Sequence, residues 1–365
     1  MFFKKLFWSF LCLTGFSLSV FAQKKEDYTK NWKKVEEFEK KGLTKSALKE
    51  VIGIYNLAIA ANNDAQQIKS AMYQVKYRNM VEEDSRENNI FFVDTLIAKA
   101  KAPAKNILQS MQAEMFWHYL QNNRWRFYDR TKLAEEKSRD ITTWSIDKLN
   151  ATITKLYTAS LQNENLLQHT KLDGLDAIII KGENTRQLRP TLYNFLAHRA
   201  LEYFMNDESD LAKPAYEFKL SDSKFFAPAA DFIKLSFPTK DTVSLQHKAL
   251  LIFHDILKFH IADADPAALI DADLIRLNFA NTYGVMEGKE KLYEAALKNT
   301  EERYPNNPAI AQAMYLRGMI YYTRGEEYDP LTKAGDQYEI KRAKELFEMA
   351  YAKFPKSEGG INAKN

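Results

Sequence analysis

Apolar residues recur at intervals of three or four along nearly every segment of this chain of 365 residues, which is the period of an amphipathic α-helix. One such stripe consists of Leu48, Val51, Ile52, Tyr55 and Ile59. The same period recurs in residues 68–75, 107–115, 149–160, 192–203 and 245–256. Strict alternation of apolar and polar residues, which is typical of half-buried strands, is almost absent. The pattern therefore predicts an all-α fold.

Short links between the expected helices predict that they pack as antiparallel pairs. Thr44 is placed to cap one helix, and Asp265 and Asn307 each precede a proline that suits a first helical turn. Gly42 marks the turn of the first pair, which extends from about residue 32 to residue 60. Residues 177–180 fit one short extended run, which is too isolated to make a sheet.

The C-terminal part contains an internal repeat. Residues 291–305 and 343–355 each end in an aromatic residue followed by proline, and residues 313–322 supply a partner helix between them. This arrangement resembles tetratricopeptide repeats, in which small residues stand where helices cross closely. Tyr304 and Phe354 are 354 − 304 = 50 residues apart, whereas the usual period is about 34. An insertion at residues 326–339 accounts for the excess.

Two longer irregular stretches interrupt the helices. Residues 161–189 are rich in Asn and Gly, and residues 206–242 contain three prolines and several acidic residues. The second stretch is predicted to be a loop and a domain boundary. We therefore expect an N-terminal helical domain at residues 23–205 and tetratricopeptide-like repeats, cut short, at residues 243–365.

Residues 1–22 have the pattern of a secretory signal peptide. Lys4 and Lys5 precede an uncharged apolar core at residues 6–21, and Val20 and Ala22 are the small residues of a cleavage site. The stretch is too short, and too soon followed by charges, to anchor the chain across a bilayer. We expect cleavage between Ala22 and Gln23 and export to the periplasm or cell envelope.

The single cysteine of the chain, Cys12, lies in the signal peptide. Because Leu11 stands where a lipoprotein signal needs a small residue, no lipid anchor is expected. The mature chain then has no disulfide, no thiolate nucleophile and no cysteine metal ligand. A large exported protein without disulfides points to a bacterial envelope.

The net charge is close to zero, with 52 basic and 48 acidic residues, which argues against a nucleic-acid partner. The segment at residues 122–131 alternates arginines with aromatic residues, a pattern that can stack on bases. The balanced charge and the export signal favour a structural interpretation instead. We expect Trp125 to be buried in a junction of helix pairs, with Arg124 and Arg126 packed on aromatic rings.

Three histidines fall on one expected helix. His247 and His254 are seven residues apart and share a face, whereas His260 is rotated away by its six-residue step. The three side chains cannot converge on one metal ion without ligands from elsewhere. We expect ordinary hydrogen-bonded or solvent-facing histidines.

Four aspartates resemble a calcium-binding loop at first sight, namely Asp263, Asp265, Asp271 and Asp273. Position six of that loop would be Ala268 instead of Gly, and position twelve would be Leu274 instead of Glu. The helix start at Pro266 explains Asp263 and Asp265 as caps instead. The chain also lacks nucleophile-elbow, dinucleotide-binding and phosphate-loop motifs. No catalytic, cofactor-binding or metal-binding residue is predicted, no cofactor is expected, and the chain is not predicted to be an enzyme.

Several short motifs of the sequence are similar to motifs of one protein family. Residues 123–127, Trp144, residues 188–201 and residues 270–277, with the opening at residues 32–43, resemble the N-terminal helical region of large alpha-2-macroglobulin-like proteins of Bacteroidetes. The similarity covers about residues 26–362. These motifs are specific as sequence patterns, but they indicate no catalytic chemistry.

The resemblance implies that macroglobulin β-sandwich domains follow and that the whole protein inhibits endopeptidases by trapping them. Its implied partners are those downstream domains and, for the whole protein, proteases. No bait or thioester residue can be assigned to this chain, so it is expected to be a fragment that supports the trapping domains. Residues 361–365 also resemble the start of a helix that is cut short.

Two other functions compete with this interpretation. The chain could be a free-standing tetratricopeptide-like scaffold of the envelope, which binds a peptide or a glycan in a groove. It could also be an enzyme with a dispersed active site, although no nucleophile–base pair or ligand triad supports that. The reading frame after residue 365 distinguishes the inhibitor module from the free-standing scaffold. A frame that continues into β-patterned sequence supports the inhibitor module, and a stop codon supports the scaffold.

Overall fold

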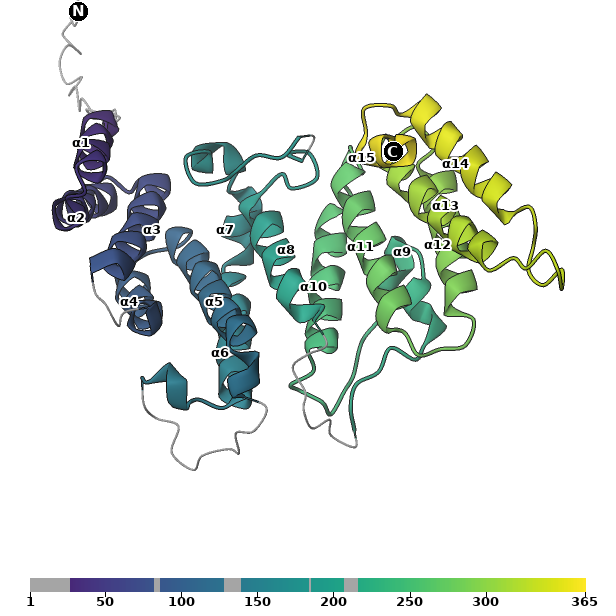
Figure 1. The fold of residues 1–365 in the computed structure, drawn as a ribbon, viewed down its shortest axis with the longest axis horizontal. Coiled ribbons are helices and arrows are strands. Elements are labelled where there is room, and N and C mark those ends of the chain that lie inside the picture. The colour runs from purple at the N-terminus through teal and green to yellow at the C-terminus, as the bar shows by residue number, and fades with distance from the viewer. Residues whose placement is uncertain (1–26, 82–85, 128–138, 184, 207–215) are drawn as a thin grey trace, which may run out of the picture.

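The computed structural model describes residues 27–81, 86–127, 139–183, 185–206 and 216–365. These residues form fifteen α-helices and four short 3-10 helices, and their only β-type pairings are two isolated bridges. The predicted all-α fold is therefore confirmed. The chain runs broadly from one end of the long axis of the molecule to the other, although α9 lies beside α11 and α12, and α15 turns back onto α13 (Figure 1). The predicted signal peptide and Cys12 lie outside the described residues.

The helices have the following bounds: α1 Thr29–Lys40, α2 Thr44–Ala60, α3 Asp64–Val81, α4 Arg86–Lys99, α5 Ala104–Asn122, α6 Ile146–Ser160, α7 Glu164–His169, α8 Leu192–Phe204, α9 Ala229–Phe232, α10 Leu245–His260, α11 Ala267–Tyr283, α12 Lys289–Arg303, α13 Ile310–Glu326, α14 Glu339–Lys353 and α15 Glu358–Lys364. The 3-10 helices are η1 Arg124–Arg126, η2 Ile141–Thr143, η3 Leu172–Leu175 and η4 Ser223–Phe226.

Consecutive helices pack on each other, most extensively α1 with α2, α2 with α3, α5 with α6 and α13 with α14. Three residues join α1 to α2, so the second helix must run back along the first. Gly42 lies in this turn with a φ of +68°, a left-handed conformation that glycine adopts without the steric cost of a Cβ. The predicted turn at Gly42 is therefore confirmed.

The helix starts differ from the predicted caps at one position. Thr44 is the first residue of α2, after Leu43, and its side chain makes no capping hydrogen bond. The side chains of Asp265 and Asn307 do cap, because they accept hydrogen bonds of 3.0 Å from the backbone N–H groups of Ala267 and Ala309. Sequence reasoning thus found the two caps next to proline and misplaced the one without it.

Buried apolar residues form two clusters. The smaller one joins α1, α2 and α3 around Trp32, Val51 and Ile54. The larger one extends from Tyr55 to Ala350 and continues through α8 and α10, where the rings of Tyr193 and Phe259 meet edge to face at 5.8 Å. Apolar burial is thus continuous across most of the described chain.

The two stretches that were predicted to be irregular contain short helices. Residues 161–189 include α7 and η3, and the described part of the second stretch includes η4 and α9. Leu220, Phe225 and Phe226 of that second part are buried in the larger cluster. The predicted domain division at residues 206–242 is not tested by these contacts and stays a prediction.

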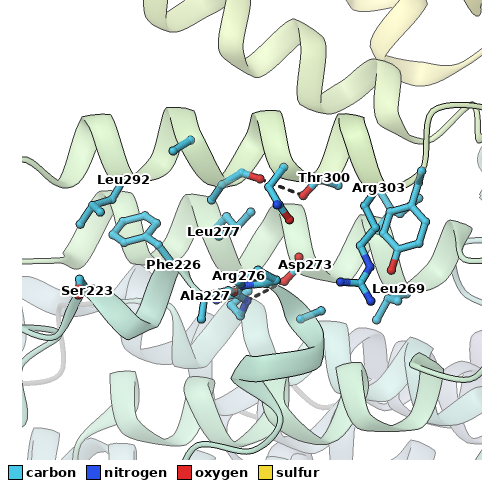
Figure 2. Close-up of a pocket in the computed structure, with 17 residues that line it drawn as sticks. Ser223, Phe226, Ala227, Leu269, Asp273, Arg276, Leu277, Leu292, Thr300 and Arg303 are labelled. Atoms are coloured by element: carbon cyan, nitrogen blue, oxygen red, sulfur yellow. Dashed lines mark hydrogen bonds and ion pairs between the residues drawn. The ribbon is translucent and has the colours of Figure 1, made fainter.

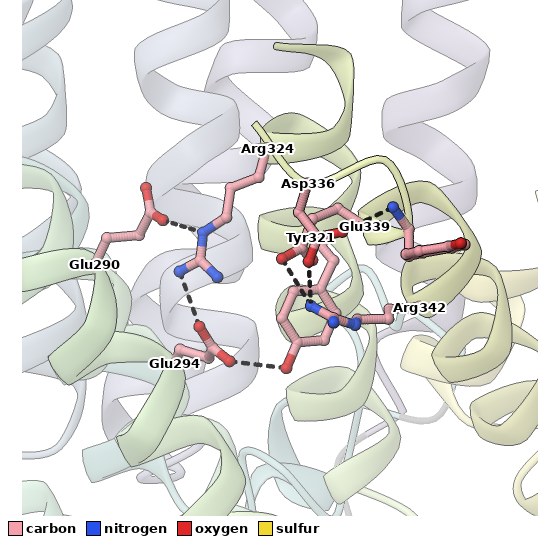
Figure 3. A network of polar contacts seen from close by, with 8 residues as sticks. Glu290, Glu294, Tyr321, Arg324, Asp336, Glu339 and Arg342 are labelled. Carbon is pink, nitrogen blue, oxygen red and sulfur yellow. Dashed lines mark hydrogen bonds and ion pairs between the residues drawn. The ribbon is translucent and has the colours of Figure 1, made fainter. Parts of the chain in front are cut away.

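Polar contacts join α12 to α13, and α14 to the loop that precedes it (Figure 3). Arg324 on α13 donates to Glu290 at 2.5 Å and pairs with Glu294 at 2.8 Å, both on α12. The Tyr321 hydroxyl donates to the same Glu294 at 2.7 Å. Arg342 on α14 pairs with Asp336 at 3.1 Å. The expected insertion forms a loop between α13 and α14, and the Arg342–Asp336 pair fixes its end.

Candidate functional site

A groove of about 1060 Å³ lies between α11, α13, α15 and the loop at residues 183–189. The three helices alternate along the chain with α12 and α14, so the groove follows one face of the C-terminal array. Its charged and amide-bearing residues are Glu183, Gln187, Arg189, Asp265, Asp271, Asn278, Asn307, Gln312, Lys356, Glu358 and Asn362. Among the described residues, this surface is the best candidate for a binding site.

A glycine allows the third wall of the groove to come close. Gly359 on α15 lies so near α13 that a Cβ built on it would be 2.1 Å from the carbonyl carbon of Ala311. Any side chain there would push the two helices apart. The Asn362 amide then donates to the Gln312 side-chain oxygen at 3.2 Å, which links the same two helices at the groove.

The base of the groove is apolar. Leu274 is buried, Ile275 and Leu316 are half-buried, and Ile361 is 42 % exposed. Carboxamides from Asn278, Gln312 and Asn362 lie on three successive walls of the same groove. Apolar contact area combined with a few groups that both donate and accept hydrogen bonds is typical of binding sites.

An ion pair closes the loop side of the groove. The Arg189 guanidinium contacts the Asp271 carboxylate on α11, and the two side chains are 23 % and 18 % exposed. Burial raises the pKa of Asp271, whereas the neighbouring Arg189 charge opposes that shift. The pair spans 82 positions of sequence and holds the 183–189 loop against α11.

His198 lies behind this ion pair. Its Nδ1 is 2.8 Å from the backbone carbonyl of Asn194, which fixes Nδ1 as the donor. Burial, followed by the Arg189 charge, lowers the pKa of His198 to about 3, so the ring is neutral at pH 7. Its Nε2 therefore has no proton to give to Asp271, from which it is 3.9 Å away. The ring fills space behind the pair.

The groove has the features of a binding surface and lacks those of an active site. Its lining contains no serine or threonine hydrogen-bonded to a histidine or carboxylate base. Over the part of the chain that the structure describes, no group of three His, Cys, Asp or Glu side chains is arranged to hold a metal ion. The groove can hold a ligand, but no reaction is evident there.

The three histidines of α10 bind separate partners. The Nε2 atoms of His247 and His254 contact the backbone carbonyls of Phe237 and Ile233 at 2.7 and 2.8 Å. The ring of His260 is buried, with its Nδ1 2.6 Å from the Asp263 carboxylate. The structure therefore confirms that they are ordinary hydrogen-bonded histidines.

The four aspartates also diverge. Asp263 binds His260, and Asp265 caps α11 while accepting from Asn307 at 2.9 Å. Asp271 pairs with Arg189, and Asp273 pairs with Arg276. Each carboxylate thus has a protein partner of its own. The contacts agree with the predicted role of Asp265 as a cap. The prediction that Asp263 is also a cap is wrong, because its carboxylate binds the His260 ring instead. Asp271 and Asp273 have structural roles that the sequence did not indicate.

The prediction for Trp125 is wrong. Its side chain is 68 % exposed, and the Arg126 guanidinium lies over its ring at 4.9 Å from the centroid. The buried residue of this segment is Phe127, which is 2 % exposed and meets the Tyr119 ring edge to face. The predicted arginine–aromatic stacking is thus confirmed for Arg126, although it occurs at the surface and not in a buried junction. Residues 128–131 of the segment lie outside the described residues.

Sequence reasoning missed the groove itself. The ion pair lies in two of the motifs that resemble the family. Arg189 is in residues 188–201, and Asp271 is in residues 270–277. Nothing in the sequence indicated that these two residues pair. The weak signal was the helical spacing of Asp271, Ile275 and Asn278, which places them on one face of α11.

The chain matches no protein-family model, no curated protein and no solved structure. Among the helices that the structure describes, none has the length and apolar character needed to span a membrane.

Proposed function

We propose that this chain is the helical N-terminal module of an exported alpha-2-macroglobulin-like endopeptidase inhibitor of the bacterial periplasm or envelope. In this role it is a non-catalytic scaffold, and it supports protease-trapping macroglobulin domains. Its partners are those domains, while proteases are the targets of the whole protein. Nucleic acid is not a partner, and no cofactor takes part.

One observation carries the scaffold role. The groove between α11, α13 and α15 is held by the Arg189–Asp271 ion pair and the Asn362–Gln312 amide contact. Its lining contains no nucleophile–base pair and no metal-ligand set. The continuous apolar cluster from Tyr55 to Ala350 makes the array a firm support for attached domains. The identity of the inhibitor family is supported by the sequence resemblance.

A support differs physically from a trap. Trapping needs a segment that a protease cuts and domains that then collapse around the attacker. The described helices are held by extensive packing, and we propose that one cut releases no closing movement. We therefore expect residues 23–365 alone to leave proteases fully active.

The test compares residues 23–365 with the product of the complete reading frame that encodes them. Each is mixed in stoichiometric amounts with proteases of different classes, and cleavage of a large protein and of a small peptide substrate is followed. The complete product is expected to suppress only cleavage of the large substrate, and residues 23–365 are expected to suppress neither. Selective protection by residues 23–365 would contradict the support role, and no protection by the complete product would contradict the family assignment.

The groove also favours a second candidate, a free-standing envelope scaffold that binds an extended polypeptide between α11, α13 and α15. The intact mass of the protein in the envelope fraction distinguishes the inhibitor module from the free-standing scaffold. A mass far above that of the mature chain agrees with the inhibitor module. A mass equal to that of residues 23–365 favours the free-standing scaffold.

A further inference from the structure

A second, smaller pocket of about 300 Å³ lies on the other side of α11 (Figure 2). It is bounded by α11, α12 and the segment that contains η4 and the start of α9. None of its lining residues belongs to the groove described above. Its volume is at the lower end of the range for small-molecule sites, so only a small ligand fits.

The walls of this pocket are largely apolar. Phe226, Leu277 and Leu292 lie toward one end, and Leu269 lies toward the other (Figure 2). Ala295 and Ala296 on α12 also line it. Because alanine side chains reach so little into the space, a narrow apolar trough is left open between the helices. Such a trough favours an unbranched apolar body.

The charges of the pocket do not cancel. Its charged lining residues are Asp273, Arg276 and Arg303, and Asp273 pairs with Arg276 at 2.6 Å. Arg303 makes no ion pair with any carboxylate in the described part of the chain, and its nearest aromatic contact is the Tyr304 ring at 5.8 Å. The Asp231 carboxylate, whose pKa Arg303 helps to lower, is bound to Lys234 at 2.8 Å. One positive charge is therefore left at one end.

We propose that this pocket binds a medium-chain monocarboxylate, with the carboxylate at Arg303 and the alkyl chain extended toward Phe226 and Leu292. A single cation matches a single negative charge, and the apolar walls match the chain. The Thr300 hydroxyl is not available to the ligand as a donor, because it donates to the Ala296 carbonyl at 3.1 Å. The head group is thus recognised by charge.

The test uses two probes of equal length, octanoate and 1-octanol, in calorimetric titrations of the mature chain. Octanoate is expected to bind at one site, and 1-octanol is expected to bind at least about fivefold more weakly, because it lacks the charge. Arg303→Gln is expected to weaken the binding of octanoate by the same factor and to leave the affinity for 1-octanol unchanged. Arg303 is exposed, so this variant keeps the fold.

A second variant, Ala296→Phe, fills the trough and is expected to abolish binding of both probes while the helical circular dichroism spectrum is retained. If that variant fails to fold, the Arg303→Gln comparison still decides. Equal affinities for the two probes, or unchanged octanoate affinity in Arg303→Gln, would overturn the proposal. Absence of octanoate binding to the mature chain would overturn it as well.

Discussion

Asp271 and Asp273 are two positions apart on α11, and each binds an arginine that fixes a different connecting segment. The Asp271–Arg189 pair is at the edge of the groove, where its side chains are 18 % and 23 % exposed. The Asp273–Arg276 pair is in the interior, where the two side chains are 7 % and 0 % exposed. Residues two apart on a helix point to different sides. Helix α11 therefore holds one segment on each of two sides.

The two arginines act differently. Arg189 comes from the loop that it fixes, and its ion pair is its link to α11. Arg276 comes from α11 itself and donates to the backbone carbonyls of Phe225 and Ala227. Its guanidinium also lies 4.3 Å from the centroid of the Phe232 ring. The comparison teaches that a fully buried arginine can make an irregular segment part of the core, whereas a half-buried one holds a loop at the edge of the groove.

The strongest test of this difference is Arg276→Ala. The variant leaves the Asp273 carboxylate buried without its partner, which costs about 3–5 kcal/mol of unfolding free energy. Chemical denaturation followed by circular dichroism measures the loss. As a control, the double variant Asp273→Asn with Arg276→Met removes both charges and is expected to lose less than Arg276→Ala. A loss below about 1 kcal/mol for Arg276→Ala would refute the role of the buried pair.

A third acid–arginine pair sharpens the comparison through pH. Glu301 on α12 pairs with Arg317 on α13 at 2.9 Å, and both side chains are 13 % exposed. Burial raises the pKa of Glu301 to about 7 from an ordinary 4.5. The folded state therefore holds this proton more tightly than the unfolded state, so the contribution to stability falls as pH rises from about 4.5 to about 7.

Glu301→Gln removes this titration. Between pH 4.5 and pH 7.5 the unfolding free energy of the variant is expected to fall about 2 kcal/mol less than that of the parent. Denaturation curves across this range measure the difference. Parallel pH profiles for the two proteins would show that Glu301 is ionised throughout and that burial does not dominate there.

Arg189→Ala tests the half-buried pair. Because both partners keep some contact with water, the loss of stability is expected to be smaller than that of Arg276→Ala, at about 1 kcal/mol. The change should be confined to the 183–189 loop, where amide exchange becomes faster while that of α11 is unchanged. A loss as large as that of Arg276→Ala would erase the distinction between the two pairs.

The smallest effect is expected at the surface. Trp125→Ala should change stability by less than about 0.5 kcal/mol, because the ring is 68 % exposed. Phe127→Ala is the matched control, since it truncates a buried ring and should cost about 3–5 kcal/mol. Equal losses in the two variants would mean that the exposed ring is buried in solution.

The helices could be predicted because their signal is local. A stripe such as Leu149, Ile153 and Tyr157 contains its own period, and all three residues are buried in α6. The six residues of α7 are too few to show a period, so that helix was missed. The exchange of roles between Trp125 and Phe127 was not predictable either, because both are large aromatic residues close together and only their contacts distinguish them.

The groove could not be predicted because it depends on distant contacts. Arg189 meets Asp271 across 82 positions, and the approach of Gly359 to Ala311 depends on how α13 and α15 pack. The same aspartates were compared with a calcium loop because they are close in sequence. On a helix, closeness in sequence separates side chains onto different faces, and tertiary partners then decide what each one does.

The contacts of Arg276 with the carbonyls of Phe225 and Ala227 lead to the central prediction, which is that residues 216–242 unfold together with α10 and α11. Two backbone amides report on it: Val285 N–H, which donates to the Leu220 carbonyl at 2.9 Å, and Phe218 N–H, which donates to Asp241 at 3.0 Å. Native-state hydrogen exchange of the mature chain measures their opening free energies. The values are expected to match those of amides in α10 and α11 within about 1 kcal/mol. Rapid exchange of Val285 and Phe218, with α10 and α11 still protected, would contradict the claim.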